Sequence, residues 1–124
     1  MPQEGCALLL GCNGVPAWEI GEIWPCLNAW EPAGERARRF RLDPREQLLA
    51  QRWARERGLQ VLGAAHSHPC STPVPSATDR DLAVAPTLQL ILSPLADWAP
   101  ACWWLDLDRD GAVTARPLRW RMVD

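Results

Sequence analysis

Positive charge is scarce in this chain, which contains no lysine and carries a formal net charge of −2. All thirteen of its basic residues are arginine. Because neutralising nucleic-acid phosphates requires an excess of positive charge, this balance argues against nucleic acid as the main partner. Eight of the arginines lie between Arg36 and Arg57, and such a density favours a solvated helix face over a basic binding patch.

Long apolar runs are also absent. No stretch of the sequence approaches the roughly 20 apolar residues that a membrane-spanning helix requires, so we expect no membrane partner. The segment Leu9-Leu10-Gly11-Cys12 has the outline of a lipoprotein processing site. However, no basic residue precedes it, and its apolar run is too short for a signal sequence.

Paired cysteine motifs are missing as well. The five cysteines are an odd number and include no Cys-x-x-Cys pair, which fits neither a disulfide framework nor a thiolate zinc site. This cysteine usage indicates a reducing compartment, so the expected location is the cytoplasm.

The chain does contain enough apolar material for one folded domain. Apolar residues make up 48% and charged residues 23% of its 124 residues, close to the averages of about 45–50% and about 25% in globular proteins. A typical domain holds about 100 to 150 residues. We therefore expect a single domain over residues 1–124, with most of the eight tryptophans packed in its core.

Hydrophobic patterning predicts an alternation of strands and helices. Cys6 to Cys12 is a continuous apolar run, typical of a strand buried on both faces. Asp43 followed by Pro44 indicates the start of a helix that ends at Gly58. Its expected apolar stripe comprises Leu48, Leu49, Trp53 and Ala54. The other expected elements are one or two short strands in 17–30, a weak strand over 39–42, strands over 59–65 and 87–93, a helix from 76 to 86, and a hairpin of 102–107 and 112–120.

The densest chemistry lies in residues 66–79, which read HSHPCSTPVPSATD. His66 and His68 are the only histidines, and on an extended segment their i, i+2 spacing directs both rings to the same side. The prolines of the following loop exclude a helix there, so the chain can turn back and bring Asp79 in as a third ligand. Two nitrogens and one carboxylate oxygen, with a fourth position left for water, are typical of a catalytic zinc site.

A purely structural interpretation of these residues stays open. The histidines taken alone are also consistent, though less favoured, with two polar residues that end a strand. Ser76 and Asp79 have the spacing of a helix capping box, with Asp in place of the preferred Glu or Gln. Both interpretations can hold together, because a capping hydroxyl and carboxylate can also face a metal.

This motif resembles the signature of the JAMM (MPN-plus, or JAB-domain) zinc metalloproteases. That signature is a glutamate upstream of His-Ser/Thr-His-Pro, then six residues, Ser, two residues and Asp. Here six residues separate Pro69 from Ser76, and Asp79 follows at the expected spacing. Glu4 precedes an apolar run that ends in Gly11, which is similar to the family's glutamate and its strand. The resemblance covers about residues 2 to 105 and is of the compact prokaryotic type.

The resemblance implies an α/β fold, namely a three-layer α-β-α domain with a mixed sheet of the MPN or cytidine-deaminase-like type. It also implies one zinc ion per chain held by His66, His68 and Asp79, with Glu4 handling the water proton and Ser76 assisting the oxyanion. One departure concerns the start of the chain, because the family usually has a helix before the glutamate and this sequence begins three residues earlier. We expect that the helix is missing, that the true start lies upstream, or that a partner subunit covers the surface.

Proteins with this signature hydrolyse amide or isopeptide bonds after the Gly-Gly tail of ubiquitin-like proteins. Compact bacterial members resemble enzymes that process ubiquitin-like sulfur carriers. Residues 31–34 and 94–100, where larger members carry insertions, are short here, which favours a narrow groove for the tail. The sequence leaves open which protein is the substrate and whether the chain forms a homodimer.

Two other functions have less support from the sequence. A non-catalytic MPN-type scaffold or binding module would share the fold, but such modules generally lose the zinc ligands that this chain keeps. A zinc deaminase acting on nucleobases would need Cys-x-x-Cys beside His-x-Glu, and both motifs are missing.

A second stretch of the sequence resembles a metal-binding motif but does not complete it. Asp106, Asp108, Asp110 and Gly111 match the first half of an EF-hand calcium loop. The position that needs a bidentate glutamate is Pro117, and the flanking segments have the pattern of strands. We therefore do not expect calcium binding.

Overall fold

The structure, a computed structural model, describes residues 4–12, 14, 17–37 and 39–123. Strands dominate these ranges, with two α-helices and two short 3-10 turns between them. In chain order the elements are β1 (Cys6–Cys12), β2 (Glu19–Cys26), η1 (Ala33–Glu35), α1 (Pro44–Glu56), β3 (Gln60–Ser67), α2 (Ala77–Leu82), β4 (Thr87–Leu92), η2 (Pro94–Ala96), β5 (Ala101–Leu107) and β6 (Val113–Leu118).

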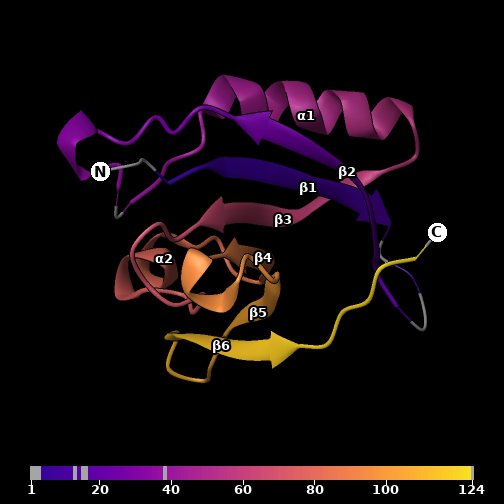
Figure 1. Ribbon diagram of the computed structural model, residues 1–124. Helices are drawn as coiled ribbons and strands as arrows, with labels where there is room; N and C mark the ends of the chain where they lie inside the picture. Colours follow the sequence, from indigo (N-terminus) through magenta and orange to yellow (C-terminus); the bar gives the residue numbers. More distant parts are fainter. Residues whose placement is uncertain (1–3, 13, 15–16, 38, 124) are drawn as a thin grey trace.

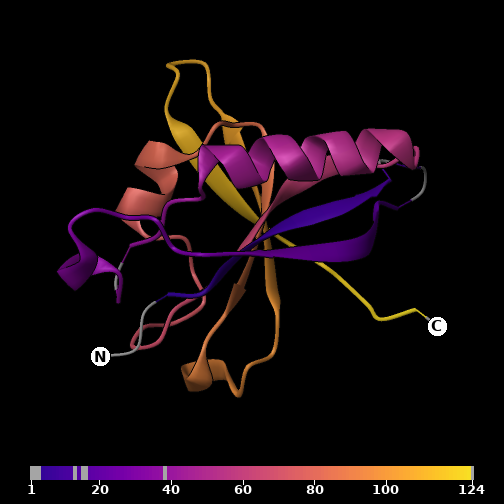
Figure 2. The same cartoon turned by 90° about the horizontal axis from the view of Figure 1, so that it is seen from above.

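The strands form one mixed sheet in the order β2-β1-β3-β4-β5-β6 (Figure 1). β3 and β4 run parallel, and the connection between them carries α2. The other neighbouring pairs are antiparallel. α1 packs against β1 and β3, whereas α2 packs against β6, as the two views from the side and from above show (Figures 1 and 2). The expected α/β fold with a mixed sheet is confirmed.

β1 is buried on both faces, as its apolar run predicts. Leu8 and Leu10 belong to the core beneath α1, while Ala7 and Leu9 belong to a second core cluster with residues of β3 and β4. Position 63 on β3 requires glycine because the backbone of β4 lies very close to it. A Cβ there would collide with the carbonyl oxygen of Leu88. β1 and β3 therefore lie side by side with both faces of β1 packed.

α1 begins as predicted. Asp43 is the N-cap and accepts a hydrogen bond from the Arg45 amide at 2.9 Å, with Pro44 at the first helical position. The predicted apolar stripe is wrong for Leu48 and Leu49, which are 66% and 52% exposed. The buried face consists of Ala50 and Ala54, joined by the half-buried Trp53. Small alanines let the helix backbone approach the sheet closely, so the leucines are turned outward.

The predicted strand over 39–42 is also wrong. Only a single isolated bridge, between Asn28 and Leu42, forms in this segment. The reason is a side chain: the carboxamide of Asn28 binds the Arg39 carbonyl and the Arg41 amide, so these groups are not available to a neighbouring strand.

The remaining predicted elements are confirmed, with one shorter helix. β2 lies at one edge of the sheet, β5 and β6 form the hairpin, and α2 ends at Leu82, before Pro86. In the hairpin turn, the Asp108 carboxylate accepts hydrogen bonds from the amides of Asp110 and Ala112 at 2.8 and 2.9 Å. The Asp108 carboxylate therefore closes the turn of the hairpin.

Cys6, Cys12, Cys26 and Cys102 form no disulfide. Among the described residues, no helix is both long enough and apolar enough to cross a membrane.

Candidate metal centre

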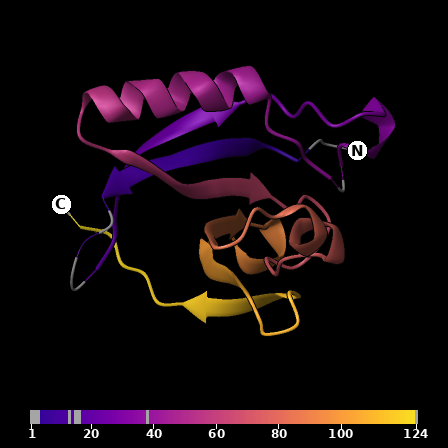
Figure 3. The same cartoon turned by 180° about the vertical axis from the view of Figure 1, so that it is seen from behind.

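Four buried side chains converge where β1 begins and β3 ends. They are Glu4, His66, His68 and Asp79, and one ligand-type atom from each lies within 4.8 Å of the others. The antiparallel register pairs Cys6 with His66, so the start of β1 adjoins the end of β3, next to α2 (Figure 3). The structure thus brings together the four residues that the sequence singled out as the glutamate and the three ligands.

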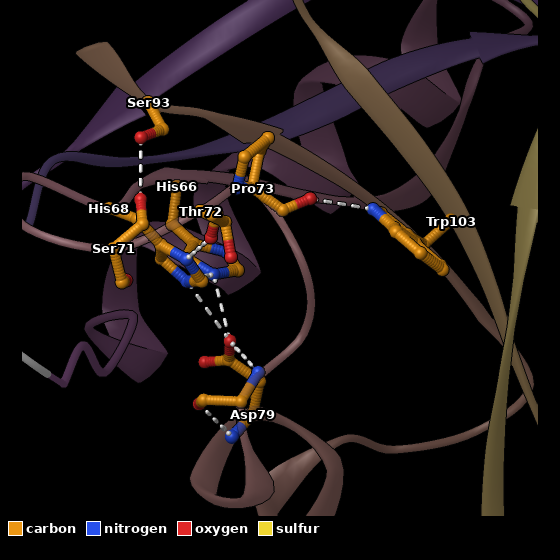
Figure 4. Close-up of polar contacts among 9 residues, drawn as sticks. His66, His68, Ser71, Thr72, Pro73, Asp79, Ser93 and Trp103 are labelled. Carbon is orange, nitrogen blue, oxygen red and sulfur yellow. Dashed lines mark hydrogen bonds and ion pairs between the residues drawn. The ribbon is translucent and has the colours of Figure 1, made fainter. Parts of the chain in front are cut away.

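Three of these atoms are in mutual contact. His66 Nε2 lies 3.0 Å from His68 Nε2 and 3.1 Å from Asp79 Oδ2, and His68 Nε2 lies 3.2 Å from the same carboxylate oxygen (Figure 4). Donors bound tetrahedrally at about 2.0–2.1 Å from one ion would lie about 3.3 Å apart. The observed spacings are close to this value, so the three atoms fit the donor set of a zinc ion.

The orientation of His68 is fixed by its second ring nitrogen. Nδ1 donates a hydrogen bond to the Thr72 carbonyl at 2.8 Å, because a carbonyl oxygen can only accept. In the neutral ring this leaves Nε2 as the lone-pair nitrogen, facing the centre. Sequence reasoning could not identify this acceptor, since it is a backbone group in an irregular loop.

The loop that contains Thr72 is held by side chains that donate hydrogen bonds to three consecutive carbonyl groups of its backbone. Ser93 Oγ donates to the Ser71 carbonyl, His68 to that of Thr72, and Trp103 Nε1 to that of Pro73 at 2.9 Å (Figure 4). A hydroxyl at the end of β4 and an indole on β5 therefore position a histidine ring at the end of β3.

His66 has different surroundings. Its ring stacks on Phe40 with centroids 4.3 Å apart and an interplanar angle of 21°. Within the described part of the chain, its Nδ1 is buried and has no hydrogen-bond partner. Burial lowers the pKa of His66 and outweighs the opposing hydrogen bond and charge of Asp79, so this ring favours the neutral, ligand-competent form.

The pKa of His68 is shifted the other way. Burial acts to lower it, but the hydrogen bonds to Asp79 and to the Thr72 carbonyl, with the charge of Asp79, give a net upward shift. Two ring nitrogens 3.0 Å apart without a proton or a cation between them repel each other. The site therefore favours a shared positive charge at its centre, which is what a divalent ion supplies.

Asp79 is held by the predicted capping box. The Ser76 amide donates to Asp79 Oδ2 at 2.9 Å, and Ser76 Oγ accepts from the Asp79 amide at 3.0 Å. Burial acts to raise the pKa of Asp79, but the hydrogen bonds to both histidines, the charge of His66 and the Ser76 amide hold it well below its usual range. One carboxylate oxygen thus both caps α2 and faces the histidines, so the capping prediction is confirmed.

Glu4 is 2% exposed, and its Oε1 has no hydrogen-bond partner in the described residues. Burial raises the pKa of this carboxyl to about 7, with the charge of His68 opposing the shift and that of Asp79 adding to it. A carboxyl that loses its proton near neutral pH is suited to exchange protons with a reacting group.

Comparison with known proteins gives one family. A sequence model described as prokaryotic homologs of the JAB domain matches residues 1–113. A protein of Haloferax volcanii named desampylase is 37% identical over 94 residues, which cover 75% of this chain and 64% of the relative, so the chain spans less than two thirds of that protein.

Two solved structures resemble the fold. A protein from Desulfitobacterium hafniense matches with a TM-score of 0.72 and 33% identity, over 94% of this chain and 77% of that one. A protein from Salinibacter ruber matches with a TM-score of 0.64 and 29% identity, over 95% of this chain and 76% of that one.

Proposed function

The chain belongs to the family of prokaryotic homologues of the JAB domain, and on that basis we propose that it is a zinc-dependent isopeptidase of the JAMM type. The proposed reaction is hydrolysis of the amide bond after the C-terminal Gly-Gly tail of a ubiquitin-like or sulfur-carrier protein. We assign it to a single domain of residues 1–124.

The observation that carries this proposal is the buried convergence of Glu4, His66, His68 and Asp79. They occupy the glutamate, histidine and aspartate positions of the JAMM signature. A scaffold module of the same fold has no need to bury two imidazoles and two carboxyl groups together, because burying such groups costs free energy unless they are paired or bind a metal.

His66, His68 and Asp79 would hold the zinc ion. When bound, zinc supplies Lewis-acid polarisation of a carbonyl group and lowers the pKa of water to about 7. The Asp79 carboxylate contributes a negative charge, which is retained because the pKa of this group lies well below neutral pH.

Glu4 is assigned to proton transfer. As a carboxylate it accepts a proton from the attacking water, and as an acid it delivers that proton to the leaving amine. Its pKa of about 7 lies close to physiological pH, the condition under which one group performs both steps efficiently.

Ser76 is assigned to stabilising negative charge on the carbonyl oxygen. Its Oγ accepts a hydrogen bond from the Asp79 amide, so the hydroxyl hydrogen of Ser76 is still available to donate. Removing a donor of this kind costs about 2.7–4 kcal/mol in other enzymes. Ser76→Thr should therefore retain more turnover than Ser76→Ala.

The name of the Haloferax volcanii relative, desampylase, supports a substrate of the ubiquitin-like modifier class. η1 and η2, in the segments where larger members carry insertions, are three-residue turns that offer little surface for gripping a folded partner. We therefore propose recognition of an extended tail through main-chain hydrogen bonds, with glycines allowing its backbone to approach closely.

Mass spectrometry of a sulfur-carrier protein bearing a C-terminal amine adduct tests this function. Incubation with the zinc-loaded protein should release the adduct, and chelation should stop the release. A variant of the carrier with its final glycine replaced by alanine should be processed much more slowly. Equal rates for both carriers would contradict the narrow groove, and a protein that binds no zinc would support the scaffold instead.

A further inference from the structure

We propose that Asn28 is a positioning residue that fixes both Glu4 and Phe40 at the metal centre. The expected effect of Asn28 on turnover rests on the proposed function, whereas the expected effect of Asn28 on the position of Glu4 does not. Asn28 is 9% exposed and lies after β2, remote in sequence from the histidine motif.

Glu4 is outside the ladder of the sheet, because β1 and its pairing begin at Cys6. Its backbone is held by the segment that follows β2. The Glu4 amide donates to the Arg36 carbonyl at 2.6 Å, and the Glu4 carbonyl accepts from Asn28 Nδ2 at 3.1 Å. Asn28 Nδ2 also lies 3.3 Å from the same Arg36 carbonyl. Both backbone groups of Glu4 therefore belong to one network centred on Asn28.

The same carboxamide fixes Phe40 from both sides. Nδ2 donates to the Arg39 carbonyl at 2.8 Å, and Oδ1 accepts from the Arg41 amide at 3.1 Å. Phe40 stands between these two bonded residues, and its ring stacks on His66. Asn28 thus fixes the backbone on both sides of the aromatic ring that covers one ligand.

Only a side-chain amide can satisfy this arrangement. Nδ2 shares its two hydrogens among three carbonyl groups, and Oδ1 accepts from the amides of Trp30 and Arg41. Alanine would leave these buried groups without their partner, and aspartate would place a carboxylate oxygen against the three carbonyl groups. Asn28→Asp therefore changes the hydrogen bonding with almost no change of shape.

The carboxyl group of Glu4 has no comparable anchor, since its Oε1 makes no hydrogen bond to the described residues. The anchoring of its backbone therefore decides where the carboxyl group lies. The three ligands, by contrast, are carried by β3, the following loop and α2. Loss of Asn28 should consequently impair proton transfer while zinc binding is retained.

Amide hydrogen exchange measured by NMR on the zinc-loaded wild-type protein tests the network without any assay of activity. The amides of Glu4, Trp30 and Arg41 should be protected, although they lie outside the named strands. Exchange as fast as that of exposed loop amides would overturn the proposal. In Asn28→Ala, which removes the Oδ1 acceptor together with the Nδ2 donor, this protection should fall at all three amides while that of β3 is kept.

The kinetic test compares Asn28→Ala and Asn28→Asp with Leu105→Ala, a control that opens the core at β5 opposite Thr87, away from the centre. Both Asn28 variants should lower kcat roughly 10- to 100-fold, with zinc content and KM nearly unchanged, because a misplaced general base costs rate and not ground-state binding. Leu105→Ala should lower thermal stability without this loss of kcat. Unchanged kcat in both Asn28 variants would overturn the proposal. If the wild type itself turned over no tail substrate, the proposed function would fail, and hydrogen exchange would still decide the role of Asn28.

Discussion

Glu4 and Asp79 are two buried carboxyl groups of one site with opposite surroundings. Asp79 Oδ2 lies 3.1 and 3.2 Å from the Nε2 atoms of His66 and His68 and accepts a hydrogen bond from the Ser76 amide, and the pKa of Asp79 lies well below the usual range. Glu4 is desolvated, with one carboxyl oxygen unpaired among the described residues, and its pKa is raised to about 7. Two carboxyl groups whose environments move their pKa values apart are suited to two roles, a permanent charge and a proton carrier.

The largest expected effect is that of removing the permanent charge. Asp79→Ala should lose both zinc and activity, because it deletes a ligand and leaves the two histidines without their common partner. Elemental analysis together with a turnover assay measures both. Zinc held at wild-type level by Asp79→Ala would mean that the ion is bound elsewhere or by Glu4.

Removing the ionisable carboxyl group of Glu4 should lower turnover without lowering zinc content. Glu4→Gln should lower turnover about 10²- to 10⁴-fold, the range of general acid–base catalysis, with zinc content close to wild type. The measurement is kcat alongside zinc per chain, and Glu22→Gln on the exposed face of β2 is the matched control. Appreciable turnover by the Glu4 variant would show that another group moves the proton.

The raised pKa of Glu4 also predicts how the stability of the protein, once a chelator has removed any metal, depends on pH. The folded carboxyl keeps its proton up to about pH 7, whereas the unfolded one loses it near its ordinary value of 4.5. The folded state therefore binds more protons between these limits, and the free energy of unfolding should fall as pH rises, by up to about 3 kcal/mol from this group.

Urea unfolding of the wild type and of Glu4→Gln in the presence of chelator, from pH 4.5 to 8, isolates this contribution. The part of the fall in unfolding free energy with rising pH that Glu4 causes should be absent from the Gln variant. Asp79 acts in the opposite direction: its lowered pKa gives stability above its ordinary value of 3.8, which is lost as the pH falls further. Identical pH profiles of the two proteins would contradict the burial of an ionisable Glu4.

The smallest expected effect concerns the loop on the Asp79 side of the site. Trp103→Phe removes the hydrogen bond to the Pro73 carbonyl but keeps an aromatic ring. Because the neighbouring Thr72 carbonyl orients His68, zinc affinity should weaken by about 10-fold, the lower end for outer partners of a metal ligand. Competition with a chelator measures this, and Trp98→Phe, at an exposed position, is the control.

The Asp79 side of the site and most of the fold could be predicted from local patterns in the sequence. The i, i+2 histidines, the capping-box spacing and the prolines between them act within fourteen residues, where strand and helix periodicity dictate which side chains share a face. The buried run of β1 and the capped start of α1 were predictable for the same reason, because both depend on local patterning.

The surroundings of those residues, by contrast, depend on how the folded chain brings its segments together. The acceptor of His68 is a backbone carbonyl of Thr72, inside the motif but in an irregular loop that no periodicity describes. The ring stacked on His66 and the carboxamide that holds Glu4 come from Phe40 and Asn28, which no spacing rule connects to the motif. The same contacts turned the predicted strand at 39–42 into an irregular segment. Local periodicity is a property of neighbouring residues, whereas the partners of buried polar groups depend on which distant segments the folded sheet brings together.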